Sequence, residues 1–124
     1  MNDIRLNDFF TLKEFECPCC HAVKLSSEAL QRLTRFRYIV GRPVTITSGY
    51  RCKAENTKIG GHPNSYHMQG MAIDIYVKGF YLEELLEVAK EVGFHGIGIY
   101  SKKNFLHLDV RPGELTVWSD HTDK

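Results

Sequence analysis

The stretch GIGIYSKKNFLHLDV, residues 96–110, decides the fold that we expect for this chain. Two runs of aliphatic, β-branched and aromatic residues flank the polar turn 101–104, and this pattern predicts a β-hairpin. Successive side chains of a strand point to opposite faces, so His107 and Asp109 share one face of the second strand. The opposite face is apolar, and we expect it to pack on a core.

Other patterns place the rest of the chain around this hairpin. Residues 71–77 alternate between apolar side chains and a second face that carries Asp74, which predicts another strand. The short β-branched run 44–47 predicts a buried strand. Capping residues, apolar periodicity and glycine stops predict three helices: one after Thr11, one capped by Ser26 and ended by Gly41, and one from Leu82 to Gly93. The expected fold is α+β, with helices packed on a small, mainly antiparallel sheet.

Two segments are expected to lack regular structure. Residues 51–66 form the longest irregular stretch, and a long loop in a compact domain is a candidate for function. The chain after Trp118 is polar, and we expect it to fray.

Length and composition fit one domain spanning residues 1–124, with its core at about 8–118. The formal charge of +1 produces no field that would draw nucleic acid or anionic lipid, so we expect no nucleic-acid partner. No apolar run approaches the roughly 18 residues of a membrane span, so we expect no membrane insertion. We also expect a monomeric protein. Charged residues in the first ten positions also argue against an export signal.

Four cysteines admit several interpretations: Cys17, Cys19, Cys20 and Cys52. Cys17, Cys20 and His21 match the CxxCH motif of covalent haem attachment, and Cys17 and Cys20 alone match a redox CxxC motif. A structural disulfide or a structural metal site would instead fasten the N-terminal segment to the core. We favour these structural interpretations, because haem attachment follows export and no export signal is expected.

A second set of residues is capable of binding a metal. Asp74 and His107 lie on strand faces opposite the apolar ones, and His67 comes just before the strand of Asp74. Two imidazoles and one carboxylate would leave a fourth tetrahedral position for water, as in catalytic zinc sites. From spacing alone, a histidine on a polar face is more often a surface or hydrogen-bonded residue than a metal ligand.

Three blocks of sequence carry a resemblance to a known family. Residues 65–74, SYHMQGMAID, match the pattern SxHxxGxAxD, with SGYR at 48–51 before it and FLHLD at 105–109 after it. The chain thereby resembles the peptidase M15 family, the zinc D-alanyl-D-alanine carboxypeptidases and related peptidoglycan peptidases, and within it the subgroup with an HxD motif. The resemblance implies the fold shared with lysostaphin-type peptidases and the hedgehog signalling domain.

The resemblance also implies roles for individual residues. It makes His67, Asp74 and His107 the ligands of one catalytic Zn²⁺, and it makes Arg51 the anchor for a substrate carboxylate. Ser65 would bind near the metal or the substrate. The alternatives are a structural ion pair for Arg51 and a turn position for Ser65.

The resemblance does not directly identify a general base in this chain. Several family members place an acidic residue three positions before the last zinc ligand, where this chain has Asn104. Asp109 is the natural replacement, either as the base or as a residue that orients the imidazole of His107. Tyr100 is a candidate donor to a developing oxyanion, or a packing residue.

Taken together, we expect a zinc peptidase that cuts peptidoglycan stem peptides or cross-links, as a carboxypeptidase or an endopeptidase. A zinc-bearing binding domain without turnover is the alternative, and Asn104 is the feature that supports it. A structural metal at the cysteines would be a second ion. Because no export signal is expected, a phage or prophage lysin made in the cytoplasm would fit such a protein, but the sequence leaves its location open.

Overall fold

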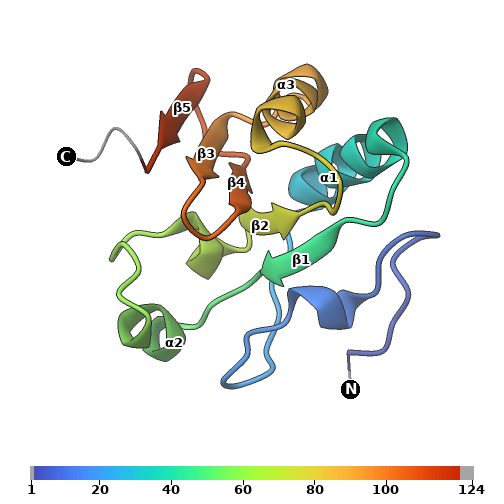
Figure 1. Ribbon diagram of the computed structural model, residues 1–124. Helices are drawn as coiled ribbons and strands as arrows, with labels where there is room; N and C mark the ends of the chain where they lie inside the picture. The colour runs from blue at the N-terminus through green and yellow to red at the C-terminus, as the bar shows by residue number, and fades with distance from the viewer. Residues whose placement is uncertain (1, 121–124) are drawn as a thin grey trace.

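A five-stranded sheet organises residues 2–120, which are the residues that the computed structural model describes (Figure 1). Its strands are β1 (Thr45–Ser48), β2 (Ala72–Tyr76), β3 (Gly96–Tyr100), β4 (Phe105–Asp109) and β5 (Thr116–Ser119). They lie in the order β1-β2-β4-β3-β5, and every pairing is antiparallel except the parallel pair of β3 and β5. The predicted α+β fold with a mainly antiparallel sheet is confirmed.

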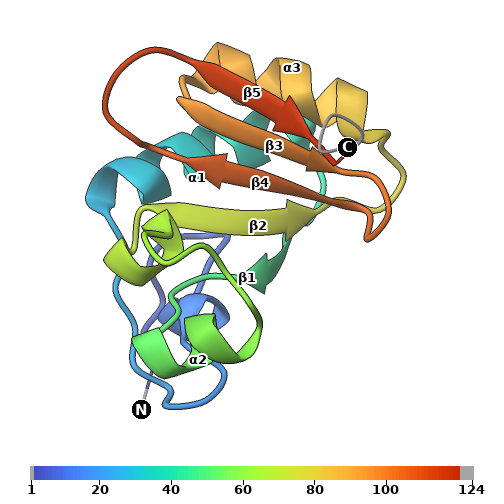
Figure 2. The ribbon, with the colours of Figure 1, turned by 90° about the vertical axis from the view of Figure 1, so that its left-hand side faces the viewer.

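Helices lie on both faces of this sheet, and their sizes differ. The long helices α1 (Ser27–Val40) and α3 (Leu82–Val92) cover one face (Figure 2). The other face carries the short helix α2 (Lys53–Lys58) and the 3₁₀ turn η2 (Tyr66–Gln69), while the 3₁₀ turn η1 (Leu12–Phe15) lies beside β1. One face of the sheet therefore meets the core, and the other is covered only by short elements.

The core lies between the sheet and the two long helices. Its fully buried members include these residues of β2, β4, α1 and α3: Ile73, Ile75, Leu106, Leu108, Leu33, Phe36 and Leu85. Full burial of one such side chain stabilises the fold by about 1.5–3 kcal/mol. The predicted apolar faces of the two strands are confirmed.

The predicted ends of the long helices are confirmed as well. The side chain of Ser26 accepts a hydrogen bond from the backbone N–H of Ala29, which satisfies one free donor at the start of α1. Helix α1 ends at Gly41 with φ of 72°, and α3 ends at Gly93 with φ of 94°. Glycine adopts these left-handed angles without the steric cost that a side chain imposes.

The pairing of β2 with β4 positions the polar side chains of the sheet. Asp74 lies opposite His107, and Ile73 lies opposite Leu108. Because residues opposite each other in a sheet share a face, Asp74 and His107 emerge side by side on the face away from the core.

Three expectations were wrong. The segment 51–66 is not irregular throughout, because it contains α2. The run 44–47 does not form a buried strand: β1 begins at Thr45 and is an edge strand that pairs only with β2, so its alternate side chains are exposed. Residues 116–119 form β5, and the backbone N–H of Asp120 still donates to Ile99 of β3. The expected fraying beyond 120 falls outside the described residues.

Among residues 2–120, no helix has both the length and the apolar character that crossing a membrane requires.

Candidate metal centre and active site

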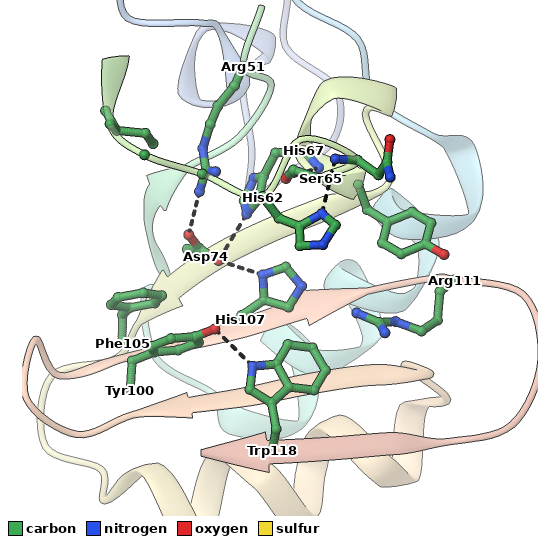
Figure 3. Close-up of a pocket in the computed structure, with 15 residues that line it drawn as sticks. Arg51, His62, Ser65, His67, Asp74, Tyr100, Phe105, His107, Arg111 and Trp118 are labelled. Carbon is green, nitrogen blue, oxygen red and sulfur yellow. Dashed lines mark hydrogen bonds and ion pairs between the residues drawn. The ribbon is translucent and has the colours of Figure 1, made fainter. Parts of the chain in front are cut away.

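Three side chains from separate elements converge on the face of the sheet away from the core (Figure 3). His67 comes from η2, Asp74 from β2 and His107 from β4. The Oδ1 atom of Asp74 lies 3.2 Å from Nε2 of His67 and 3.0 Å from Nδ1 of His107. The three candidate ligand atoms lie within 4.8 Å of one another, and the group is largely buried. One cation would therefore reach all three.

The outer hydrogen bonds of the two imidazoles determine which nitrogens face inward without a proton. Nδ1 of His67 lies 2.8 Å from the carbonyl oxygen of Gly49, and a carbonyl only accepts, so this nitrogen carries the proton. Nε2 of His107 lies 2.7 Å from a carboxylate oxygen of Asp109 and donates to it in the same way. In the neutral rings, the nitrogens that face Asp74 then present lone pairs to a carboxylate. This donor set fits a divalent cation such as zinc.

Buried charge interactions shift the pKa values of these groups. Burial raises the pKa of the Asp74 carboxyl, but its close contacts with the rings of His107 and His67 outweigh burial and hold that pKa well below its ordinary value. Burial lowers the pKa of His107, but hydrogen bonds to Asp109 and Asp74 outweigh it and raise that pKa. Asp74 is therefore ionised at neutral pH, as a metal ligand must be.

Glycine allows the close approach that positions His67. A Cβ atom on Gly49 would lie 2.6 Å from the carbonyl oxygen of Phe15, so no larger residue fits there without a shift. The backbone N–H of Tyr50 donates to the same oxygen at 2.9 Å. The SGYR block thus packs tightly on η1 and leaves the Gly49 carbonyl directed at His67.

Arg51 joins this group rather than standing apart from it. Its guanidinium donates to Oδ2 of Asp74 at 3.3 Å, to Asn56 at 3.2 Å and to Ser48 at 3.2 Å. It also lines a cavity of about 630 Å³ over the three candidate ligands His67, Asp74 and His107. The ion pair and the cavity position coexist, so the geometry is compatible with both interpretations of Arg51.

Ser65 begins the turn that carries His67. Its hydroxyl oxygen accepts a hydrogen bond from the backbone N–H of His67 at 3.1 Å, which makes it the N-cap of η2. The residue also lines the cavity. Ser65 therefore lies next to the candidate ligand His67, and the hydrogen bond of its hydroxyl caps the turn.

Asp109 lies behind His107 and is fully buried. Besides the hydrogen bond from His107, the Asp109 carboxylate accepts one from the backbone N–H of Arg111 at 3.1 Å. It also accepts from Nε and from one terminal nitrogen of the Arg111 guanidinium, at 2.9 and 2.7 Å. Burial raises the pKa of Asp109, but the hydrogen bonds from His107 and Arg111 outweigh burial and hold the pKa well below its ordinary value. These contacts favour the orienting role over the role of base.

Several cavity residues were not recognised in the sequence. Tyr66, Arg111 and Trp118 also line the cavity, and Figure 3 shows Trp118 on the side away from Arg51. The guanidinium of Arg111 lies 5.0 Å from the ring of Tyr66 and 4.8 Å from the ring of Trp118. Arg111 continues the alternation of His107 and Asp109 by two residues, so strand periodicity could have identified it. Trp118 depends on β5, which the sequence pattern did not reveal.

Tyr100, Asn104 and His62 lie in different places relative to the cavity. Tyr100 lines the cavity, stacks on Phe105 and accepts a hydrogen bond from Trp118 Nε1 at 2.8 Å. Asn104 sits in the turn between β3 and β4 with φ of 57°, and it does not line the cavity. His62 lines the cavity rim, where its Nδ1 accepts from the backbone N–H of Asn64.

The four cysteines gather in a separate group. The sulfur atoms of Cys17, Cys19, Cys20 and Cys52 lie within 4.8 Å of one another, and all four are free thiols. None of them lines the cavity over the candidate ligands.

Comparison with known proteins agrees with the geometry. The chain is 32% identical over 88 residues to peptidoglycan L,D-endopeptidase MepK of Escherichia coli K12, covering 65% of this chain and 48% of the relative. It is 31% identical over 90 residues to the zinc D-Ala-D-Ala carboxypeptidase of Streptomyces albus G, covering 71% of this chain and 35% of the relative. The chain thus spans about half or less of the length of these relatives.

A family model described as peptidase M15 matches residues 8–109. That match includes β1 to β4 and all three converging ligand side chains, so the resemblance seen in the sequence blocks is confirmed. The chain belongs to the peptidase M15 family.

Proposed function

We propose that this chain is a zinc metallopeptidase that hydrolyses peptide bonds in peptidoglycan stem peptides or cross-links, within one domain of residues 1–124 whose core spans about 8–118. The observation that carries the proposal is the convergence of two imidazole lone pairs and one carboxylate under the cavity. Three such ligands leave a fourth tetrahedral position open, as in catalytic zinc sites. The names of the relatives, a peptidoglycan endopeptidase and a zinc carboxypeptidase, support the same cofactor and substrate class.

When bound, zinc supplies a Lewis acid that lowers the pKa of water and polarises a peptide carbonyl. The residues of this chain prepare the site for it. The Gly49 carbonyl and the Asp109 carboxylate keep the protons of His67 and His107 on the outer nitrogens. Arg51 holds Oδ2 of Asp74, which leaves Oδ1 directed between the two rings.

Arg51 is also placed to bind a substrate carboxylate. A guanidinium has five N–H donors, and the described contacts of Arg51 use one on each of its three nitrogens. One N–H on each terminal nitrogen is left for a ligand in the cavity. Two donors from one guanidinium can bind the two oxygens of a carboxylate, which is the group that the C-terminus of a peptide presents.

The opposite wall of the cavity supplies contacts for the body of the peptide. Trp118 and Tyr66 offer flat apolar surfaces, and Ser65 offers a hydroxyl near His67. The hydroxyl oxygen of Tyr100 already accepts from Trp118, so its own proton is available to a substrate oxygen. We assign Tyr100 and Ser65 to substrate binding, and we assign Asp109 to orienting the imidazole of His107.

Digestion of purified cell-wall sacculi tests this function, with the released fragments identified by mass. We expect release by the wild type and by the control His95→Ala, because the exposed His95 does not line the cavity. We expect no release by His67→Ala, together with loss of the zinc bound at this site. If the wild type releases no fragment that His67→Ala does not also release, the peptidase proposal is wrong.

One observation favours a second candidate, a zinc-bearing domain that binds peptidoglycan without turnover. Asp74 is the only carboxylate among the described residues that line the cavity, and the acidic position of the family is Asn104 here. The same experiment separates the two candidates. A binding domain would cosediment with sacculi in a zinc-dependent manner and release nothing.

A further inference from the structure

We propose that Cys17, Cys19, Cys20 and Cys52 form a second metal centre, a tetrahedral thiolate site for zinc that holds the Arg51 segment in place. The proposal concerns residues that the peptidase site does not use. It also stands independently of whether the chain hydrolyses peptidoglycan.

The sulfur positions fit one shared ion. The Sγ atom of Cys17 lies 3.7 Å from that of Cys19 and 3.6 Å from that of Cys52, and the last two lie 3.2 Å apart. A tetrahedron with zinc–sulfur bonds of about 2.3 Å has edges of about 3.8 Å. The Cys20 sulfur completes the group within 4.8 Å of the other three. Four sulfurs at the corners of one small volume are what a Cys₄ zinc site requires.

The backbone of the N-terminal loop brings three of these sulfurs together. The N–H of Cys17 donates to the carbonyl of Ala22 at 2.8 Å, and the N–H of His21 donates to the carbonyl of Cys17 at 2.9 Å. His21 takes a left-handed φ of 62°, which reverses the chain after Cys20. The loop thus closes on itself with its cysteines facing the same side as Cys52.

The fourth cysteine is fixed from the other segment. The backbone N–H of Cys52 donates to the sulfur of Cys17 at 3.5 Å, and Cys52 is the N-cap of α2, where its own sulfur accepts from the N–H of Glu55. Amide donors stabilise the negative charge that thiolate ligands carry.

The other interpretations of the cysteines explain less of this geometry. Haem attachment through CxxCH would need an accessible Cys17, but that side chain is fully buried, and the ring of His21 is paired with Glu16 at 3.1 Å. A redox pair or a single disulfide would use two sulfur atoms, and it would not explain why the other two lie beside them. A shared ion accounts for all four.

The position of Cys52 connects this centre to the cavity. Arg51 immediately precedes Cys52, and its N–H donates to the carbonyl of His67 at 3.3 Å. In α2, Asn56 accepts from Arg51 and donates to the carbonyl of His62 at 2.9 Å. An ion at the cysteines therefore fastens loop 17–22 to the segment that presents Arg51 and one wall of the cavity.

Metal analysis of the full-length protein, purified under reducing conditions, tests the proposal. We expect about two zinc ions per chain in the wild type and about one in His67→Ala/His107→Ala. We also expect about one in Cys19→Ser/Cys20→Ser, which changes only exposed thiols, whereas the control Lys53→Ser beside Cys52 retains both.

A spectroscopic measurement does not depend on the folding of the cysteine variants. Cobalt(II) added to metal-free His67→Ala/His107→Ala should give the intense visible absorption and the thiolate charge-transfer band of tetrahedral cobalt thiolates. A spectrum without these bands, or a zinc-free double-histidine variant, overturns the proposal. An intact mass that shows a disulfide among these cysteines in reduced preparations also overturns it. These readouts are distinguishable from failure of the proposed function, because none of them measures the release of fragments.

Discussion

Asp109→Asn is the substitution that most directly separates the orienting role of this residue from the role of base. The change keeps the side-chain volume at a fully buried position. It replaces a carboxylate that accepts from His107 Nε2, from two guanidinium nitrogens of Arg111 and from a backbone N–H. An amide has one oxygen and two N–H donors, so it cannot accept from His107 and from both nitrogens of Arg111.

The consequence for the metal site follows from the tautomer of His107. If the amide nitrogen faces the ring, Nε2 must accept, and the proton of the neutral ring moves to Nδ1, the atom that faces Asp74. The inward lone pair is then lost. If the oxygen faces the ring instead, Arg111 loses its charged partner. Loss of such a partner to a ligand histidine typically lowers metal affinity by about 10–100-fold, or about 1.4–2.7 kcal/mol.

Trp118 provides the assay. It is the only tryptophan in the sequence, and its ring centroid lies 5.3 Å from that of His107. Titration of metal-free protein with cobalt(II), followed by quenching of tryptophan fluorescence, therefore reports binding next to His107. Wild-type affinity in Asp109→Asn, combined with a loss of turnover of about 100-fold or more, would refute the orienting role and make Asp109 the base.

Three further predictions concern binding, pH and stability. Arg51→Lys should retain zinc but raise KM by about 10–100-fold with a smaller effect on kcat, because an ammonium lacks the planar pair of donors that a guanidinium offers to a carboxylate. Steady-state kinetics on a stem peptide measures both constants. An unchanged KM would contradict the anchor role. The raised pKa of His107 stabilises the metal-free protein at pH values below about 6.5, and this contribution is lost as pH rises through the folded-state pKa. Since zinc must displace that proton, cobalt affinity in the Trp118 assay should be weaker at about pH 6 than at about pH 8, and equal affinities would be inconsistent with this titration. Phe36→Ala removes a fully buried ring from α1 and should lower the free energy of unfolding by about 3–5 kcal/mol in urea denaturation; a loss below about 1 kcal/mol would mean that the site repacks.

Sequence periodicity was sufficient where the structure is locally determined. The alternation around Asp74 and His107 predicted both strands and their polar faces, because a strand repeats every two residues whatever its neighbours are. The pairing register that places the two side chains opposite each other supports the motif-based choice of ligands.

Periodicity was insufficient where long-range packing decides the structure. β5 pairs in parallel with β3, although β4 and two connecting segments separate the two strands in the sequence. Nothing in the four residues 116–119 specifies that partner. Helix α2 has six residues, too few to show an apolar period. The sulfur of Cys52 reaches Cys17 only because Gly49 lets β1 approach η1, and this contact is invisible in the local sequence.

The four residues from Gly49 to Cys52 each contact a different part of the molecule. In order, they contact the ring of His67, the carbonyl of Phe15, the carboxylate of Asp74 and the sulfur of Cys17, while Ser48 accepts from the Arg51 guanidinium within the segment. A one-residue insertion or deletion here would displace all later contacts together, so this segment should accept no change in length. The exposed turn around Gly113, where an added side chain would meet nothing within 4 Å, is by contrast a suitable place to insert a tag or a reporter peptide.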